Sequence, residues 1–133
     1  MKLFKSNGVL KYEDASQYKY KLIVEVDRGI YFFYRSLIPK WIQTSPQKYA
    51  PHISIVRKEQ PTNLEHWGKY EGEQIEFEYS NEIHHVQYYW WLNAFSCRLE
   101  EIRLELGLLV SSEYTVAPEG YVKTFHITLG NVK

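Results

Sequence analysis

The order strand, helix, strand occurs twice in this chain, and this duplication limits the possible folds more than any other feature. Apolar and polar residues alternate over 18–26, as in a strand with one face buried. The two units cover 18–26, 30–38 and 52–56, and then 86–93, 95–106 and 125–129. We therefore expect an α+β fold with two pseudo-symmetric lobes, about 18–56 and 86–129, whose antiparallel sheets line a central cleft.

Turn and cap residues predict where these elements begin and end. Asn7-Gly8 between apolar residues favours a hairpin turn. Asp27 is a suitable N-cap for the first helix, and Gly107 is a suitable residue to end the second.

The side-chain pattern predicts which face each helix presents. In the first helix, the spacing of Ile30, Phe33, Tyr34 and Leu37 predicts one apolar face. In the second helix, the charged residues are expected on a solvated face; they are Arg98, Glu101, Arg103 and Glu105.

Length and composition fit one domain, 1–133, with a core large enough to fold without disulfides. The single cysteine, Cys97, suits a reducing compartment, and no secretory signal opens the chain, so we expect a cytoplasmic protein, in the host cytoplasm if it is viral. Sixteen basic residues balance sixteen acidic ones, which argues against gripping a long duplex nucleic acid. No apolar run is long enough to span a bilayer, and we expect no membrane partner.

A short motif is repeated in the last strand of each unit. His52-Ile53-Ser54-Ile55 and His126-Ile127-Thr128-Leu129 both read histidine, apolar, hydroxyl, apolar. Because side chains alternate across a strand, each imidazole shares one face with its hydroxyl. With a pKa near ~6.5, one imidazole can act as base and the other as acid, while the hydroxyls stabilise charge on a phosphoryl group. We expect the two histidines to face each other across the cleft.

The paired motifs and the duplicated plan resemble the two-histidine (2H) phosphoesterase superfamily. That superfamily includes 2′-5′ RNA ligase-like proteins, 2′,3′-cyclic nucleotide phosphodiesterases and phage proteins that hydrolyse cyclic oligonucleotide signals of bacterial immunity. The resemblance implies that His52, Ser54, His126 and Thr128 are the catalytic set of a phosphodiesterase that needs no metal and no cofactor. Many relatives carry a further strand or lid after the second motif, so here the residues that close over substrate are expected elsewhere in the chain.

The implied substrates are an RNA 2′,3′-cyclic phosphate, a 2′-5′ linkage or a cyclic oligonucleotide messenger. The partner would then be a small nucleotide, a cyclic oligonucleotide or an RNA end. Candidate substrate-binding residues are Tyr12, Tyr49, Arg57, Trp67, Trp90 and Lys123. His84, His85 and Cys97 match no metal-ligand spacing, so no metal site is expected. The alternative is a protein of the same fold that binds a nucleotide without cleaving it.

Overall fold

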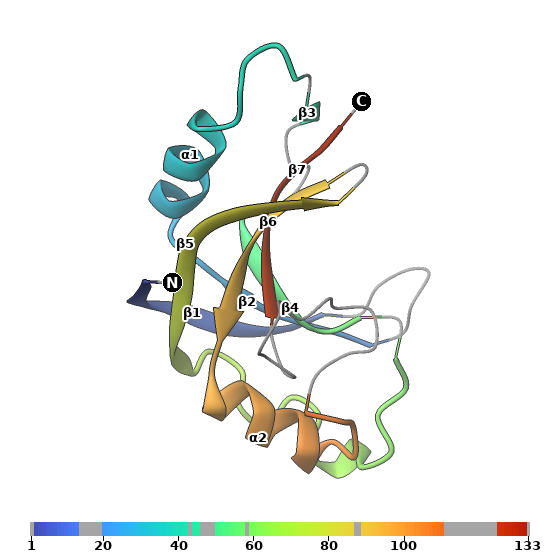
Figure 1. The fold of residues 1–133 in the computed structure, drawn as a ribbon. Helices are drawn as coiled ribbons and strands as arrows, with labels where there is room; N and C mark the ends of the chain where they lie inside the picture. Colours follow the sequence, from blue (N-terminus) through green and yellow to red (C-terminus); the bar gives the residue numbers. More distant parts are fainter. Residues whose placement is uncertain are drawn as a thin grey trace.

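In the computed structural model, the strands form one antiparallel sheet, and six of them close into a barrel. The structure describes residues 2–13, 20–42, 44–45, 50–57, 59–86, 89–110 and 125–132. Six strands follow one another as β7-β4-β2-β1-β5-β6, and β6 pairs again with β7, which closes a barrel; β3 adds to the free side of β7. Figure 1 shows α1 at the upper left and α2 at the bottom, with the barrel strands between them.

The described elements are mostly strands, of 2 to 13 residues, with two α-helices of nine residues each. In chain order they are β1 Leu3–Glu13, β2 Lys21–Glu25, α1 Arg28–Ser36, β3 Thr44–Ser45, β4 His52–Val56, the 3₁₀ turn η1 Leu64–His66, β5 Gln74–Val86, β6 Tyr89–Phe95, α2 Cys97–Glu105 and β7 Phe125–Val132. Among the described residues, no helix has the length and apolar character needed to cross a membrane.

The expected bilobal α+β fold is wrong. Its two units do not build separate sheets that face each other across a cleft, because strand β7 of the second unit pairs directly with β4 of the first, Ile53 opposite Ile127. The first strand of the chain also pairs with β5, which bridges the units a second time. These two long-range pairings merge the units into one closed barrel.

Apolar residues from neighbouring strands form a continuous row on the inner face of the barrel. Leu10, Val24 and Ile53 are opposite one another in register, and Ile127 and Leu92 continue the row. All five have no exposed surface. Burying a side chain of this size stabilises the fold by roughly 1.5–3 kcal/mol, so this row forces the alternate residues of the same strands onto the other face.

The Asn7-Gly8 pair lies inside the continuous strand β1, so the expected hairpin turn is wrong. Glycine is needed here for space: a Cβ on Gly8 would lie 2.4 Å from Val24 Cγ1 and 2.5 Å from the carbonyl oxygen of Glu25. The absent side chain lets β1 and β2 approach closely.

Helix α1 begins as expected, but only part of its predicted apolar face is buried. The Asp27 carboxylate accepts a hydrogen bond from Gly29 N at 2.6 Å, which confirms the N-cap. The buried residues of the helix are Tyr31 and Tyr34, whereas Phe33 is 58% exposed. The predicted apolar face is therefore right for Ile30 and Tyr34 and wrong for Phe33 and Leu37. Residues 31–34 are all aromatic and lie on all sides of the helix, so contacts with the barrel decide which of them are covered.

Helix α2 packs Leu99 and Ile102 into the core, and Gly107 ends it with a φ of 83°. Arg103, expected on a solvated face, is fully buried. Its guanidinium forms a two-pronged ion pair with Glu59, at 2.9 and 2.8 Å, and donates to the carbonyl of Ile55 at 2.6 Å. This pair ties α2 to the segment that follows β4.

Candidate active site

The two histidine motifs lie side by side on the outer face of the barrel wall. Ile53 and Ile127 are cross-strand partners on the inner face. Continued by one residue each way, this antiparallel register sets His52 opposite Thr128 and Ser54 opposite His126. Each imidazole is therefore next to the hydroxyl of the other motif. The expectation that the histidines face each other across a cleft is wrong, because β4 and β7 are neighbours in one wall.

His52 has a defined hydrogen-bond arrangement. Its Nδ1 lies 2.8 Å from the carbonyl oxygen of Ala50, which can only accept, so Nδ1 carries the proton and the Nε2 lone pair is left for a base. Burial lowers the pKa of His52, and the nearby Lys21 and Arg57 cations lower it too, against the opposing effects of the Ala50 carbonyl and Glu13. The ring is therefore neutral at neutral pH.

A small pocket of about 170 Å³ opens beside His52. Its lining residues are Lys11, Glu13, Lys21, Ile23, Glu25, Ala50 and His52. Lys21 lies 3.4 Å from Glu13, and Lys11 lies 3.5 Å from Glu25. The pocket therefore presents both donors and acceptors next to the imidazole.

His126 is surrounded by aromatic residues of β6. Its Nδ1 lies 3.2 Å from the hydroxyl of Tyr89, and its ring centre lies 5.0 Å from that of Trp91. Tyr89 in turn stacks on Trp91 at 4.7 Å. Burial raises the pKa of Tyr89, although Arg57 acts against it, so the phenol stays protonated. These contacts hold the second imidazole in place.

One cation is close to both halves of the site. Arg57 is exposed and follows β4 directly. Its charge lowers the pKa of His52 and also that of Tyr89, the partner of His126. An exposed guanidinium whose charge acts on both halves of the site is suited to bind a phosphate in two-pronged fashion.

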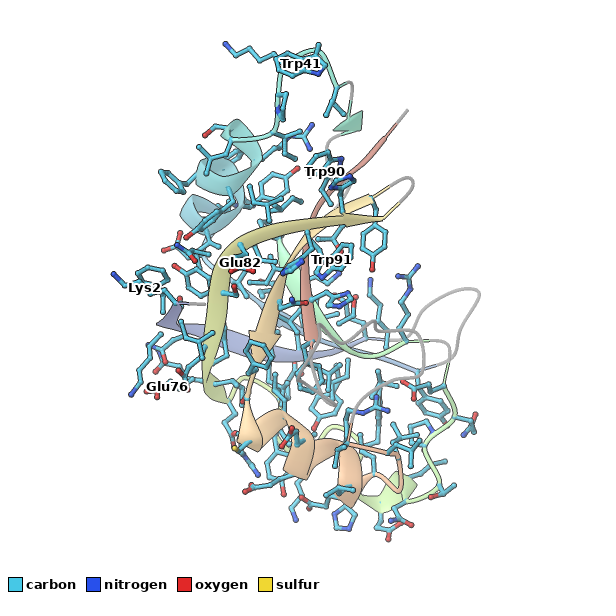
Figure 2. All side chains as sticks on the ribbon, in the orientation of Figure 1. Lys2, Trp41, Glu76, Glu82, Trp90 and Trp91 are labelled. Carbon is cyan, nitrogen blue, oxygen red and sulfur yellow. The ribbon has the colours of Figure 1, made fainter. Side chains whose placement is uncertain are left out.

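The other predicted binding residues lie elsewhere. Tyr12 and Trp67 meet edge to face at 4.9 Å and pack against the core, so the structure gives them a packing role. Trp90 stacks on His85 at 4.3 Å and also packs against the core, on the opposite face of β6 from Trp91 (Figure 2). Two further candidates lie outside the described residues, Tyr49 and Lys123.

Tyr89, Trp91 and Asn93 were missed as neighbours of the site. Asn93 is opposite His126, and Trp91 is opposite Thr128. Asn93 is 1% exposed; its Oδ1 accepts from Trp91 Nε1 at 2.8 Å, and its Nδ2 has no partner among the described residues. Strand alternation already separated Trp90 from Trp91, but only the pairing of β6 with β7 shows which of them is beside the histidine.

Within the described residues, no group of three or more histidine, cysteine, aspartate or glutamate side chains could hold a metal ion. No protein-family model, no curated protein and no solved structure matches the chain.

Proposed function

We propose that the chain is a phosphodiesterase that cleaves a nucleotide phosphodiester by general acid–base catalysis, without needing a metal. The observation that carries the proposal is the antiparallel pairing of Ile53 with Ile127. Continued by one residue each way, this register puts His52 beside Thr128 and Ser54 beside His126. This arrangement gathers two imidazoles and two hydroxyls on one patch of the barrel wall. It is the minimum set for moving two protons while stabilising charge on phosphate oxygens.

The roles of the histidines follow from their surroundings. His52 is the base, because its free Nε2 and lowered pKa keep it able to take a proton. His126 is the acid, because the Tyr89 hydroxyl oxygen can accept the Nδ1 proton of the charged ring and so stabilise it. Arg57 would neutralise the phosphate.

For a 2′,3′-cyclic phosphate the reaction balances as follows. His52 removes a proton from water as its oxygen attacks phosphorus, one ribose P–O bond breaks, and His126 gives its proton to the leaving ribose oxygen. The product is a phosphate monoester, and the two histidines exchange protons with solvent to return to their starting states. The same steps apply to a 2′-5′ linkage or to a cyclic oligonucleotide, which are the other substrates considered.

The test is incubation of the full chain with 2′,3′-cyclic nucleotides, a 2′-5′-linked dinucleotide and cyclic oligonucleotides in EDTA, with products read by mass spectrometry. His52→Ala and His126→Ala should each lower turnover by about 10² or more. His85→Ala is the matched control, because this exposed histidine is stacked on Trp90 away from the site. Nucleotide binding without any cleavage would instead support the non-catalytic binder, and loss of activity in EDTA would contradict the acid–base scheme.

A further inference from the structure

Helix α1 and the turn after it expose an unusual amount of apolar surface. Phe32 is 62% exposed, Phe33 58%, Leu37 55% and Trp41 84%. We call these four residues the α1 surface. Figure 2 shows Trp41 beyond the end of the helix, away from the barrel strands. Single exposed apolar residues are ordinary, but four within ten positions of one helix and turn mark a contact surface.

The opposite face of α1 holds the helix to the barrel and so fixes the direction of this surface. Tyr31, Tyr34 and Ile38 are buried in the core. Arg35 donates to the carbonyl of Leu129 at 2.8 Å. Because these contacts occupy one side of the helix, Phe32, Phe33 and Leu37 point outward without any rearrangement of the fold.

The surface lies in a positively charged part of a chain that is neutral overall. No acidic residue occurs in the helix and the turn after it, positions 28 to 42, where the cationic residues are Arg28, Arg35 and Lys40. Arg28 and Lys40 are exposed at the two ends of the α1 surface. The nearest acid in sequence, Asp27, is engaged as the helix cap. A partner of this surface should therefore be apolar and negatively charged.

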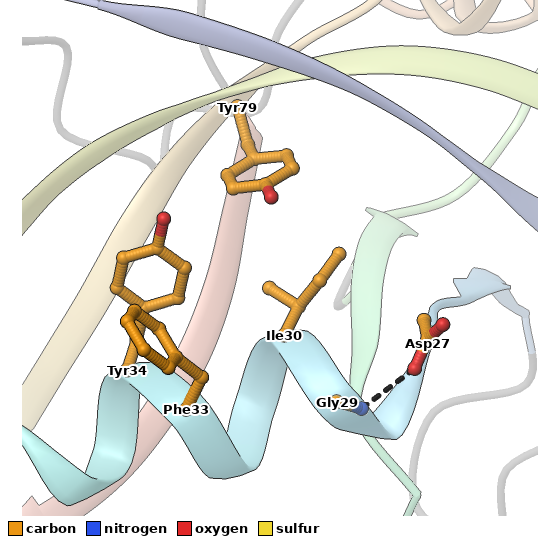
Figure 3. Close-up of a pocket in the computed structure, with 6 residues that line it drawn as sticks. All are labelled: Asp27, Gly29, Ile30, Phe33, Tyr34 and Tyr79. Carbon is orange, nitrogen blue, oxygen red and sulfur yellow. Dashed lines mark hydrogen bonds between the residues drawn. The ribbon is translucent and has the colours of Figure 1, made fainter.

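A pocket extends the α1 surface inward. It measures about 410 Å³ and is lined by residues of α1 and its cap together with Tyr79 of β5. The Tyr34 and Tyr79 rings meet edge to face at 6.1 Å, and Figure 3 shows Phe33 beside Tyr34. Aromatic rings with a polar tip next to fully apolar side chains are typical of proteins that sit at the boundary between lipid headgroups and acyl chains.

We infer that the α1 surface docks the protein on a lipid bilayer that carries anionic headgroups. Phenylalanine, leucine and tryptophan enter the interface, while the flanking cations meet the lipid phosphates. A second copy of the chain fits less well, because a two-fold contact would bring the cations of one copy, Arg28 and Lys40, near the same cations of the other. A nucleic acid would leave Leu37 without a stacking or hydrogen-bonding partner.

This inference is independent of the proposed catalytic function, and it revises the expectation of no membrane partner. That expectation rested on the lack of a spanning segment. A helix that lies in the plane of the interface needs no spanning length.

The experiment is co-sedimentation of the full chain with vesicles of phosphatidylcholine alone or with about 30% phosphatidylserine. Binding should be at least about ten-fold stronger to the anionic vesicles, because each basic residue near the surface contributes about five-fold. Leu37→Ser should weaken it by on the order of ten-fold. Leu104→Ser is the matched control, since Leu104 is also 55% exposed but lies on α2 among acidic residues.

Four outcomes would overturn the inference: no binding to either vesicle, equal binding to both, an equal effect of Leu104→Ser, or no effect of Leu37→Ser. Two parallel measurements identify the rival partners. Retention on single-stranded RNA lost in Leu37→Ser, without vesicle binding, would assign the surface to nucleic acid. A dimer in sedimentation velocity that Leu37→Ser abolishes, again without vesicle binding, would assign it to self-association. Circular dichroism of both variants verifies folding, and nucleotide cleavage should be unchanged in both.

Discussion

Ile53 and Ile127 are direct partners across the β4–β7 pair, and both are completely buried. Their side chains point into the barrel, so the residues on either side of each isoleucine share the outer face. This one apolar contact therefore aligns the two polar motifs, in opposite directions and in register. The core of the protein and its candidate site therefore lie on opposite faces of the same pair of strands.

The reciprocal register predicts which residues act together. Ser54→Ala or Thr128→Val should each reduce turnover by about 10-fold to 10³-fold, because a donor to the phosphate is lost while proton transfer remains. A double-mutant cycle should show stronger coupling between His52 and Thr128 than between His52 and Ser54, because direct cross-strand neighbours are closer than residues two apart on one strand. The readout is kcat/KM of the single and double variants, and equal coupling in the two pairs would contradict the register.

The lowered pKa of His52 predicts a pH dependence of stability. Burial is the main cause of the lowering, so the unfolded chain, with a pKa near ~6.5, binds a proton at higher pH than the folded chain does. The contribution to stability is complete above this unfolded-state pKa and is lost as pH falls from it toward the folded-state value. Urea unfolding at several pH values should show this decline in wild type and a flatter profile in His52→Gln. An unchanged profile would show that other groups cause the decline.

The buried ion pair of Arg103 predicts a large loss on single substitution. Arg103→Met leaves the Glu59 carboxylate, which is 15% exposed, without its two-pronged partner, so the free energy of unfolding should fall by about 3–5 kcal/mol. Arg98→Met on the same helix is the control. Its partner Glu73 and Arg98 itself are about one-third exposed, and the loss should stay below about 1 kcal/mol. Chemical denaturation measures both, and similar losses would contradict the burial argument.

Gly107 and Gly68 allow two reasons for requiring glycine to be compared, the backbone conformation and the lack of space for a side chain. Both have a φ of 83°, so alanine at either position costs on the order of 1 kcal/mol in backbone strain. A Cβ at Gly107 would also overlap Thr62 Oγ1, whereas a Cβ at Gly68 meets nothing within 4 Å. Thermal unfolding should therefore show a clearly larger loss for Gly107→Ala than for Gly68→Ala. The double variant Gly107→Ala with Thr62→Gly should recover part of the difference.

Local signals predicted parts of this structure well. Asp27 and Gly107 fix helix ends through interactions within a few residues, and strand alternation placed each histidine with its hydroxyl. The closure of the barrel was not predictable in this way, because it depends on pairings such as Leu3 with Ser80 that no short pattern encodes. Phe33 was assigned to the buried face of α1 because residues 31–34 of this helix are all aromatic, so every side of the helix offers an apolar residue.

Arg103 shows a further reason for the errors. A charged residue on a helix is ordinarily solvated, and only the arrival of Glu59 and the Ile55 carbonyl makes its burial favourable. The neighbours of His126 were missed for the same cause: Tyr89 and Trp91 become its partners only when β6 and β7 pair. In each case the local sequence pattern lacks information about contacts between segments that are far apart in the chain.

The β4–β7 pairing has the fewest paired residues of the strand pairings that form the barrel. Among the described residues it consists of the one pair Ile53–Ile127, against seven pairs between β1 and β5. A strand pairing with so few paired residues can open in a local fluctuation that leaves the remaining strands and both helices intact. Because this pairing brings the two motifs together, such opening would inactivate the site while the other strand pairings persist. Mild heat or denaturant would then abolish activity before the rest of the fold is lost.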